Sequence, residues 1–432
     1  MAQGKNSIYI IILLAGVLIG LLGNGYLTSN DSQIEPIIIE KHPLEGKTIQ
    51  IGYICSSNDG LWFTEPLIND IILTDINDYS YKLGYDTQFE CLIDSADDQV
   101  AIHLEKVQSF NTLGLNVFRG GPWSSMAQAA LSYVNDNNML MISPSSTSPT
   151  LSIPNDRLYR LCPTDYVEAP IIAEMWASWG AKAVIIFQRG DSWGDGMYNI
   201  LESELQQRGI IVLERIRFAP EVTEFSNYLY IINNILEDAI EQYGANYVGI
   251  QTLTFSEEVV LVTQTPDYPN TRKVIWMGAA GTGRNQMMID DAGGLQVKLR
   301  FFSPLMTSSK SWKWKSLEER FKSLTELQAD FYIATDYDAL WLIALSMLET
   351  GSLDASVIDN VFMDIARNYF GASGWVDLDE NGDRKATGIF EIYGFTDDSY
   401  QIWGECDAIK TKVIWYDNLL EEANITRPSL KK

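Results

Sequence analysis

The sequence predicts an α/β protein with two doubly wound lobes, each built on a parallel sheet. Short runs rich in β-branched residues alternate with amphipathic stretches of helical length, which is typical of βαβ units. The first series of strand-like runs lies at 48–55, 85–94, 115–120 and 139–143, and the second at 182–187, 210–218, 246–253 and 273–278. Two lobes are favoured over one sheet of nine or more strands, because such wide sheets are less common.

The C-terminal third departs from this alternation. After Leu299 the pattern predicts a strand at 300–306, a helix near 312–329 and a second helix at 337–351. Asn381 and Gly382 lie between two apolar runs, which predicts a β-hairpin. This part is expected to add antiparallel strands to the α/β core. At the start of the second series, Asp165 and Glu168 have the spacing of a capping box for a helix that reaches Trp179.

The N-terminus predicts a membrane location. Residues 8–27 form a continuous apolar stretch, about the 20 residues that a transmembrane helix needs. Lys5 precedes it and would stay in the cytoplasm, so the rest of the chain would face the outside. A retained N-terminal transmembrane helix is favoured over a cleaved signal peptide, with 28–47 as a tether. We expect an extracellular or periplasmic protein that is anchored to the membrane, or secreted if the segment is cleaved.

The net charge and the cysteines indicate which partners the protein can bind and which cellular compartment it occupies. The formal net charge of −26 argues against nucleic acid, because phosphate binding needs clustered Lys and Arg. An even number of cysteines in an exported chain predicts two disulfides, and the favoured pairs are Cys55 with Cys91 and Cys162 with Cys406. All three connectivities stay open. Asn30 and Asn424 lie in glycosylation sequons, which fits an outside location.

Catalytic motifs are weak throughout. The chain has two histidines, His42 in the tether and His103 in a predicted helix, where a role at the surface or in the core is expected. The run GAAGTG at 278–283 lacks the spacing of a dinucleotide fingerprint. DLDENGD at 377–383 starts like a calcium loop, but its twelfth position is Gly388 instead of Glu. We therefore expect no enzyme activity, no metal and no cofactor.

The loops after the predicted strands are rich in Gly, Ser, Thr and Trp. In open parallel sheets, ligands bind outside the carboxyl ends of the strands. The segments at these ends are SSNDGLW, GGPWSS, SPSSTSP, QRGDSWGDG, TLTFSE and GAAGTG. Uncharged donors at helix N-termini can hold a carboxylate or carbonyl oxygen. Trp62, Trp123 and Trp193 would supply apolar walls for a small solute.

The order of these motifs resembles a known family. ISPSSTSPTLS at 142–152 is followed by YRLCPTD, and GGPWSS, AVIIFQRGDSWGDG, TDYDALWLIALSM and GASGWVDLDENGDR occur in the matching places. Together they resemble the type I periplasmic solute-binding proteins, the group that includes the Leu/Ile/Val-binding proteins of ABC transporters. The similarity covers roughly residues 47–415.

The resemblance implies two lobes joined by a hinge of three chain crossings. Lobe 1 would hold 48–162 plus 301–373, lobe 2 would hold 163–300 plus 374–418, and 419–432 would be a C-terminal tail. The lobes would close around a small-molecule solute. The expected partner is an ABC permease in the membrane.

The resemblance also assigns ligand-binding residues. Ser124, Ser145 and Thr147 would hold a carboxylate, and the apolar lining would comprise Trp62, Trp123, Trp193 and Leu253. Where the amino-acid binders of the family carry an acid facing the ligand ammonium, this sequence has Ala280. A buried ammonium without its partner costs roughly 3–5 kcal/mol, so a neutral or anionic small polar solute, such as an amide, a carboxylate or a short peptide derivative, is expected first. An amino acid is the second choice, with Asp191, Asp59 or Glu257 as a substitute acid.

Two other functions remain as alternatives. A ligand-binding sensory domain of a receptor would act with a separate signalling partner, since no second membrane segment follows the lobes. An enzyme on an α/β fold lacks a nucleophile, a metal cluster and a cofactor cradle in this sequence.

Overall fold

The computed structural model describes residues 41–385 and 388–428, and residues from Leu44 onward form one compact unit. The predicted transmembrane segment at 8–27, most of the tether and the sequon at Asn30 lie outside the described residues. Within the described part, one helix, α12 (Phe331–Thr350), has the length and hydropathy of a membrane span. Because 78% of its apolar window is buried inside the protein, α12 is a core helix here.

The first lobe has a six-stranded, wholly parallel sheet in the order β13-β5-β4-β3-β1-β2. Its strands are β1 (Thr48–Cys55), β2 (Gln88–Ser95), β3 (Val117–Arg119), β4 (Leu140–Ser143), β5 (Leu158–Pro163) and β13 (Asp383–Arg384). The helices are α1 (Leu61–Pro66), α2 (Leu73–Lys82), α3 (Val100–Leu113), α4 (Ser124–Asp136), α11 (Trp312–Thr325), α12 and α13 (Ala355–Arg367), with a π-helix, η2 (Leu67–Ile72). Short elements are η1 (Asn58–Gly60), η3 (Pro149–Leu151), β11 (Phe370–Gly371) and β12 (Gly374–Trp375).

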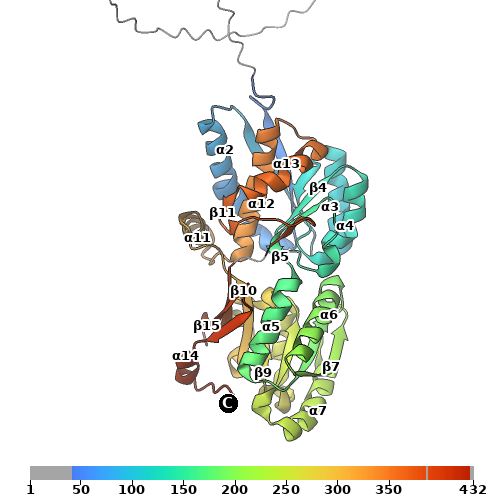
Figure 1. The fold of residues 1–432 in the computed structure, drawn as a ribbon, viewed down its shortest axis with the longest axis vertical. Coiled ribbons are helices and arrows are strands. Elements are labelled where there is room, and N and C mark those ends of the chain that lie inside the picture. Colours follow the sequence, from blue (N-terminus) through green and yellow to red (C-terminus); the bar gives the residue numbers. More distant parts are fainter. Residues whose placement is uncertain (1–40, 386–387, 429–432) are drawn as a thin grey trace, which may run out of the picture. The chain divides into compact units, whose positions relative to one another are not determined.

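Alternation along β1 divides the core of this lobe into two layers. Ile51 and Tyr53 pack in the layer that includes residues of α2, α12 and α13, whereas Ile54 packs with residues of α3 and α4. Successive side chains of a strand point to opposite faces, so both faces of the sheet are covered by helices. Figure 1 shows α12 and α13, from late in the chain, beside the strands and helices of residues 48–143.

The second lobe has an eight-stranded sheet in the order β16-β15-β14-β10-β9-β8-β6-β7. Its strands are β6 (Ala183–Arg189), β7 (Ile211–Phe218), β8 (Val248–Leu253), β9 (Ile275–Met277), β10 (Phe301–Met306), β14 (Ile389–Phe395), β15 (Tyr400–Asp407) and β16 (Lys412–Trp415). The helices are α5 (Asp165–Trp179), α6 (Ser192–Gln207), α7 (Ser226–Tyr243), α8 (Glu257–Thr263), α9 (Gln286–Asp290), α10 (Leu295–Lys298) and α14 (Asp417–Glu422). Short 3₁₀ turns are η4 (Ala245–Tyr247), η5 (Thr265–Asp267), η6 (Pro269–Arg272) and η7 (Ala280–Thr282).

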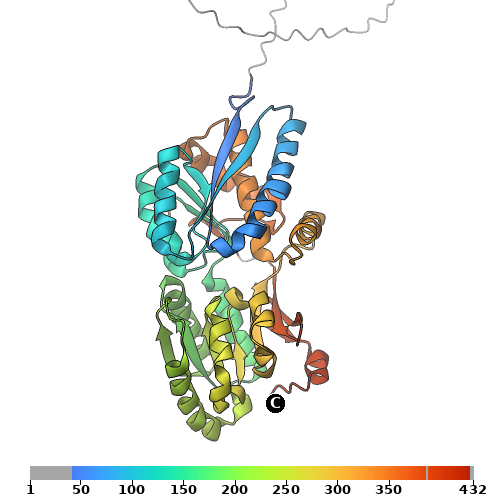
Figure 2. The same cartoon turned by 180° about the vertical axis from the view of Figure 1, so that it is seen from behind.

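The second sheet is parallel from β7 to β10 and antiparallel from β10 to β16. Residues of α5 and α6 pack on one face, and residues of α7, α8 and α9 pack on the other. Figure 2 shows the same elements from behind. The predicted two-lobed α/β architecture with added antiparallel strands is therefore present.

Two of the three predicted lobe boundaries differ from the structure. The first crossing follows β5, close to the predicted position. The second follows β10 instead of preceding 301, because Phe301 pairs with Trp276 of β9 and Phe302 pairs with Gly394 of β14. The third lies between β13 and β14 instead of at 373/374, because Asp383 pairs with Arg160 of the first sheet. An apolar run indicates that a strand forms, but it does not determine which strand it pairs with.

The predicted Asn-Gly turn is present in a shorter form. Gly382 has φ +74°, a left-handed conformation that glycine adopts at low cost. The Asp379 carboxylate accepts hydrogen bonds from the amides of Asn381 (2.9 Å) and Asp383 (3.0 Å). Leu378 and Arg384 form one antiparallel bridge. Instead of a long hairpin, the turn delivers β13 to the edge of the first sheet.

The predicted disulfides are wrong, because all four cysteines are free. On the neighbouring strands β1 and β2, Cys91 pairs with Ile51, and Cys55 pairs with Ser95. This four-residue offset is about 13 Å along a strand at 3.3 Å per residue, beyond the reach of a disulfide. Cys162 lies in the first sheet and Cys406 in the second.

Candidate functional site

Loops that follow the strands of the two sheets meet between the lobes. The Ser148 hydroxyl, after β4, donates to the Ser192 carbonyl at the start of α6 (2.9 Å). Trp123, after β3, stacks on Phe255, after β8. The carboxyl ends of strands from both sheets therefore form one shared region, which we call the interlobe site: the segments 121–124, 145–148, 165–168, 189–193, 253–257 and 279–281.

The predicted serines fix the first wall of the interlobe site. Ser124 Oγ accepts hydrogen bonds from the amides of Thr147 and Ser148, both at 3.1 Å. Ser145 Oγ donates to the Pro122 carbonyl at 2.6 Å. Because an accepting hydroxyl keeps its own proton, Ser124 can still donate to a ligand. The structure thus brings Ser124, Ser145 and Thr147 together, and it uses the Ser145 proton to hold the loop in place.

A buried ion pair stabilises the loop at 145–148. The fully buried Arg160 guanidinium contacts the Asp383 carboxylate through Nε (2.6 Å) and Nη2 (2.7 Å). Its Nη1 donates to the Ser148 carbonyl at 2.7 Å. Neither residue was predicted, because their pairing depends on β13 returning to the first sheet.

His103 has the expected role in the core. Its Nε2 accepts a hydrogen bond from the Gly121 amide at 2.9 Å, and its side chain is fully buried. Burial lowers the pKa of His103 to about 3, so the imidazole is neutral. It holds the loop that carries Trp123.

Three aromatic rings stack between the lobes. The Phe255 ring lies between Trp123 (centroids 5.3 Å apart, planes at 25°) and Trp193 (4.5 Å, 21°). Gly281 makes room for it, since a Cβ there would lie 2.7 Å from the Phe255 ring. The space between the two predicted indoles is therefore filled by a side chain of the protein itself. A solute with a flat group has to displace Phe255 or lie beside the stack.

The substitute acids predicted for the ligand ammonium are engaged or exposed. Arg189 forms ion pairs with Asp191 (2.7 Å) and Glu257 (2.8 Å), and its guanidinium lies over the rings of Trp123 and Phe255. Asp191 also accepts hydrogen bonds from the first amides of α6. Asp59 is exposed in η1.

Two other acids lie in the interlobe site. Asp165 is fully buried, and neither carboxylate oxygen has a hydrogen-bond partner. Burial raises its pKa to about 7; the polar side-chain groups of Thr147 and Trp193, which lie near the carboxyl without completing a hydrogen bond to it, and the charge of Arg160 oppose this rise. Glu168 Oε1 accepts a hydrogen bond from the Ala280 amide at 2.6 Å. Burial, and then the charge of Asp165, raise the pKa of Glu168 to about 8.

The capping-box interpretation of these two acids is wrong. Thr164 is the N-cap of α5, and no side chain caps this helix. Instead, the Glu168 carboxylate contacts the amide of Ala280. Ala280 is the position at which the amino-acid binders of the family carry an acid and this sequence does not. The D-x-x-E spacing fits both roles, and only tertiary burial separates them.

The remaining predicted residues differ in their surroundings. Leu253 is fully buried in the core cluster that also contains Trp193. Trp62 is 56% exposed and contacts Phe63 edge to face, and no described contact joins it to the other site residues. Within residues 41–385 and 388–428, no group of three or more His, Cys, Asp or Glu side chains has the arrangement of a metal site.

Comparisons with known proteins agree with this architecture. Residues 73–239 match the family model described as "Receptor family ligand binding region". An uncharacterised protein of Methanocaldococcus jannaschii is 26% identical over 388 residues, which span 85% of this chain and 91% of that protein.

Solved structures of binding proteins share the fold. A leucine-binding protein LivK of Thermotoga maritima has a TM-score of 0.70 at 18% identity, covering 86% of this chain and 99% of its own. A solute-binding protein of an R. palustris ABC transporter, solved with benzoate, has a TM-score of 0.66 at 12% identity, covering 82% and 95%. The comparisons confirm the predicted resemblance at the level of the fold, and both of these solved structures are of binding proteins.

Proposed function

We propose that the chain captures a small solute in the interlobe site; its type I periplasmic binding protein fold and the match of residues 73–239 to the receptor-family ligand-binding model support this. We further propose that it acts on the outer face of a membrane and delivers the solute to an ABC permease. The apolar segment at 8–27 supports this placement. A sensory role with a separate signalling partner would use the same binding step.

One observation carries the choice of ligand. The Asp165 carboxyl is buried beside Thr147 and Trp193 with both oxygens unpaired. A buried polar group without a partner costs free energy, which a ligand donor would recover. An ammonium group fits this position best, because it adds a charge pair to the hydrogen bonds. The proposed ligand is therefore an amino acid or a related amine.

A carboxylate on the same ligand has a place at Ser124, which is joined to Asp165 through Thr147. The Ser124 hydroxyl at the N-terminus of α4 keeps a proton to donate, and helix N-termini attract anions. Trp123 and Trp193 supply the apolar surfaces. A neutral amide is the second candidate, because the raised pKa values of Asp165 and Glu168 leave part of each carboxyl protonated at neutral pH.

A binding experiment with a matched control tests this assignment. The full-length chain is screened by thermal shift against the twenty standard amino acids and their decarboxylated amines, and hits are titrated by calorimetry. Asp165→Asn should weaken binding of the ammonium-bearing hit by on the order of a hundredfold or more, the loss expected when one partner of a buried pair is removed.

Asp156→Asn is the control. Asp156 also has a pKa raised by burial to about 7 and one buried oxygen without a partner, but it lies outside the interlobe site. Equal loss of affinity in both variants would refute the role of Asp165. Binding of neutral amides alone would favour the second candidate.

A further inference from the structure

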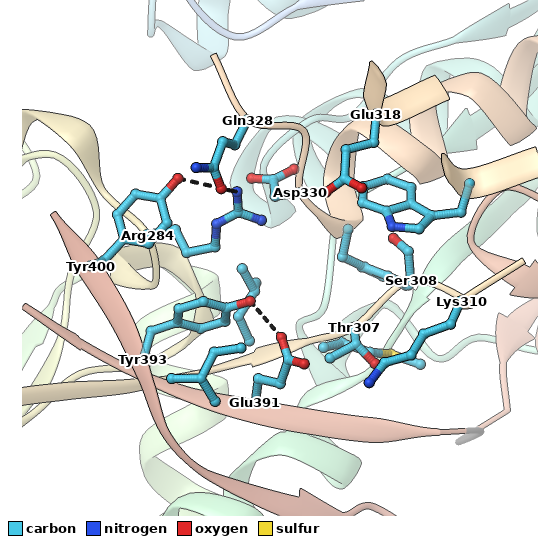
Figure 3. Close-up of a pocket in the computed structure, with 15 residues that line it drawn as sticks. Arg284, Thr307, Ser308, Lys310, Glu318, Gln328, Asp330, Glu391, Tyr393 and Tyr400 are labelled. Atoms are coloured by element: carbon cyan, nitrogen blue, oxygen red, sulfur yellow. Dashed lines mark hydrogen bonds between the residues drawn. The ribbon is translucent and has the colours of Figure 1, made fainter. Parts of the chain in front are cut away.

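A cavity lies near the crossing segment between β10 and α11, apart from the interlobe site. It has a volume of about 380 Å³, within the range of small-molecule pockets. Its walls come from the first turns of α11 and α12, the end of β10, the crossing segment 307–310, and strands β14 and β15. Figure 3 shows the polar side chains gathered around this space, which we call the hinge pocket.

Arg284 is the main cation of the hinge pocket. Its guanidinium lies over the rings of Tyr400 (5.1 Å) and Tyr393 (5.6 Å). Its hydrogen bonds go to neutral acceptors, the Ala329 carbonyl (2.8 Å), the Gln328 amide oxygen (3.2 Å) and the Tyr400 hydroxyl (3.1 Å). Its Nε is buried without a partner. Among the described residues, Arg160 and Arg189 form ion pairs with carboxylates, whereas Arg284 has no carboxylate oxygen within ion-pair distance.

Two more donors line the crossing segment. Ser308 Oγ is buried without a hydrogen-bond partner, and Lys310 is exposed at the edge of the pocket. Figure 3 shows Ser308 and Lys310 across the space from Arg284. Buried donors are nearly always satisfied in folded proteins, so the pocket offers unused hydrogen-bond donors to a ligand.

The carboxylates of the pocket are mostly engaged. Glu391 accepts a hydrogen bond from the Tyr393 hydroxyl at 2.5 Å. Asp330 accepts the Ile333 amide at 3.0 Å as the N-cap of α12; burial raises its pKa, and the charge of the nearby Arg284 opposes that rise. Glu318 is half-buried on α11 beside Trp314. The buried groups of the pocket that have no hydrogen-bond partner are the donors Arg284 Nε and Ser308 Oγ. The pocket therefore favours a ligand that carries acceptors over a cation.

The rest of the lining is apolar. Leu305, Met306, Trp314, Phe331 and Ile402 complete the walls. From these contacts we propose that the hinge pocket is a second ligand site, separate from the interlobe site, for a small organic carboxylate with an apolar body. Arg284 binds the carboxylate with help from Ser308 and Lys310, and the apolar body packs on Trp314 and Ile402.

Calorimetric titration of the full-length chain with 4-methylpentanoate tests this site. This probe carries a carboxylate and a branched apolar body but no ammonium. Binding should be measurable, and Arg284→Gln should weaken it at least tenfold, since a charge-assisted hydrogen bond is worth about 1.5–3 kcal/mol. Isopentylamine, which has the ammonium and no carboxylate, should not compete for the pocket.

Arg300→Gln is the matched control, because Arg300 is also half-buried with a left-handed backbone (φ +52°, against +59° for Arg284) but bonds to the Lys273 carbonyl. Lys310→Gln, at an exposed position that leaves the fold intact, should weaken binding severalfold. Absence of 4-methylpentanoate binding, or binding that Arg284→Gln and Lys310→Gln both leave unchanged, would overturn the proposal. Asp165→Asn should not alter the affinity for 4-methylpentanoate. The hinge-pocket proposal can therefore fail or hold independently of the proposal for the interlobe site.

Discussion

The interlobe site and the hinge pocket leave opposite charges unpaired. In the interlobe site the arginine is satisfied by two carboxylates, while Asp165 is buried without a partner. In the hinge pocket Glu391 and Asp330 accept hydrogen bonds, while Arg284 Nε has no acceptor. The comparison teaches that the group left unpaired by the fold, more than the total charge of a cavity, indicates the ligand. It predicts an ammonium ligand in one place and a carboxylate ligand in the other.

The largest expected effect concerns the support of the interlobe site. Arg160→Ala leaves the Asp383 carboxylate buried without its partner, so the free energy of unfolding should fall by about 3–5 kcal/mol. Arg157→Ala, which removes a half-buried pair with Asp359 at 3.6 Å, should cost about 1 kcal/mol or less. Urea denaturation measures both. Equal costs would show that the loop does not depend on the buried pair.

The next effect is the pH dependence of stability to which the interlobe acids Asp165 and Glu168 contribute. The pKa values of Asp165 and Glu168 are raised from 3.8 and 4.5 to about 7 and about 8, so the folded state binds more protons than the unfolded state between these limits. Their contribution to stability is fully present below about pH 4 and is lost as the pH rises through 7 to 8. Each group changes the free energy of unfolding by up to about 1.4 kcal/mol per pH unit.

Denaturation between pH 5 and pH 8 measures this slope. The double variant Asp165→Asn, Glu168→Gln should have a flatter profile than the unmodified chain. A profile that is unchanged in the double variant would assign the pH dependence to other carboxyls, such as Glu258, whose pKa burial also raises to about 7.

A smaller effect concerns the aromatic stack. Phe255→Ala removes two ring contacts, each worth about 0.5–1.5 kcal/mol, so stability should fall by about 1–3 kcal/mol while affinity for a solute with a flat group rises. Phe370→Ala is the control, because Phe370 has a single edge contact with Trp375. Thermal unfolding and titration measure the two effects. Weaker solute binding in Phe255→Ala would mean that the Phe255 ring contacts the solute, instead of filling the space that the solute needs.

The sequence was informative wherever a local pattern determines structure. Strand and helix alternation predicted the two sheets, and the polar loops after the strands predicted that Trp123, Ser124, Thr147 and Trp193 lie together. The partner of β10 could not be predicted, because an apolar strand pairs equally well in either sheet. The disulfide prediction failed because adjacency of two strands does not fix their register.

The unpaired acids were missed for a related reason. Asp165 and Glu168 have the spacing of a helix cap, and their burial against Ala280 and Trp193 arises only when the two series of strands fold together. Phe255 is a single aromatic residue in a loop, which carries no periodicity. Arg284 lies far in sequence from Tyr393 and Tyr400, and its pocket exists only after the third crossing.

Proton release on binding tests the central claim most directly. If an ammonium-bearing solute binds beside Asp165, a carboxyl with pKa about 7 must ionise, and on the order of half a proton should be released at pH 7. Calorimetry in buffers of different ionisation enthalpy measures this number. The account predicts release by the unmodified chain and by Asp156→Asn, and none by Asp165→Asn. Binding without proton release, or release that persists in Asp165→Asn, would contradict it.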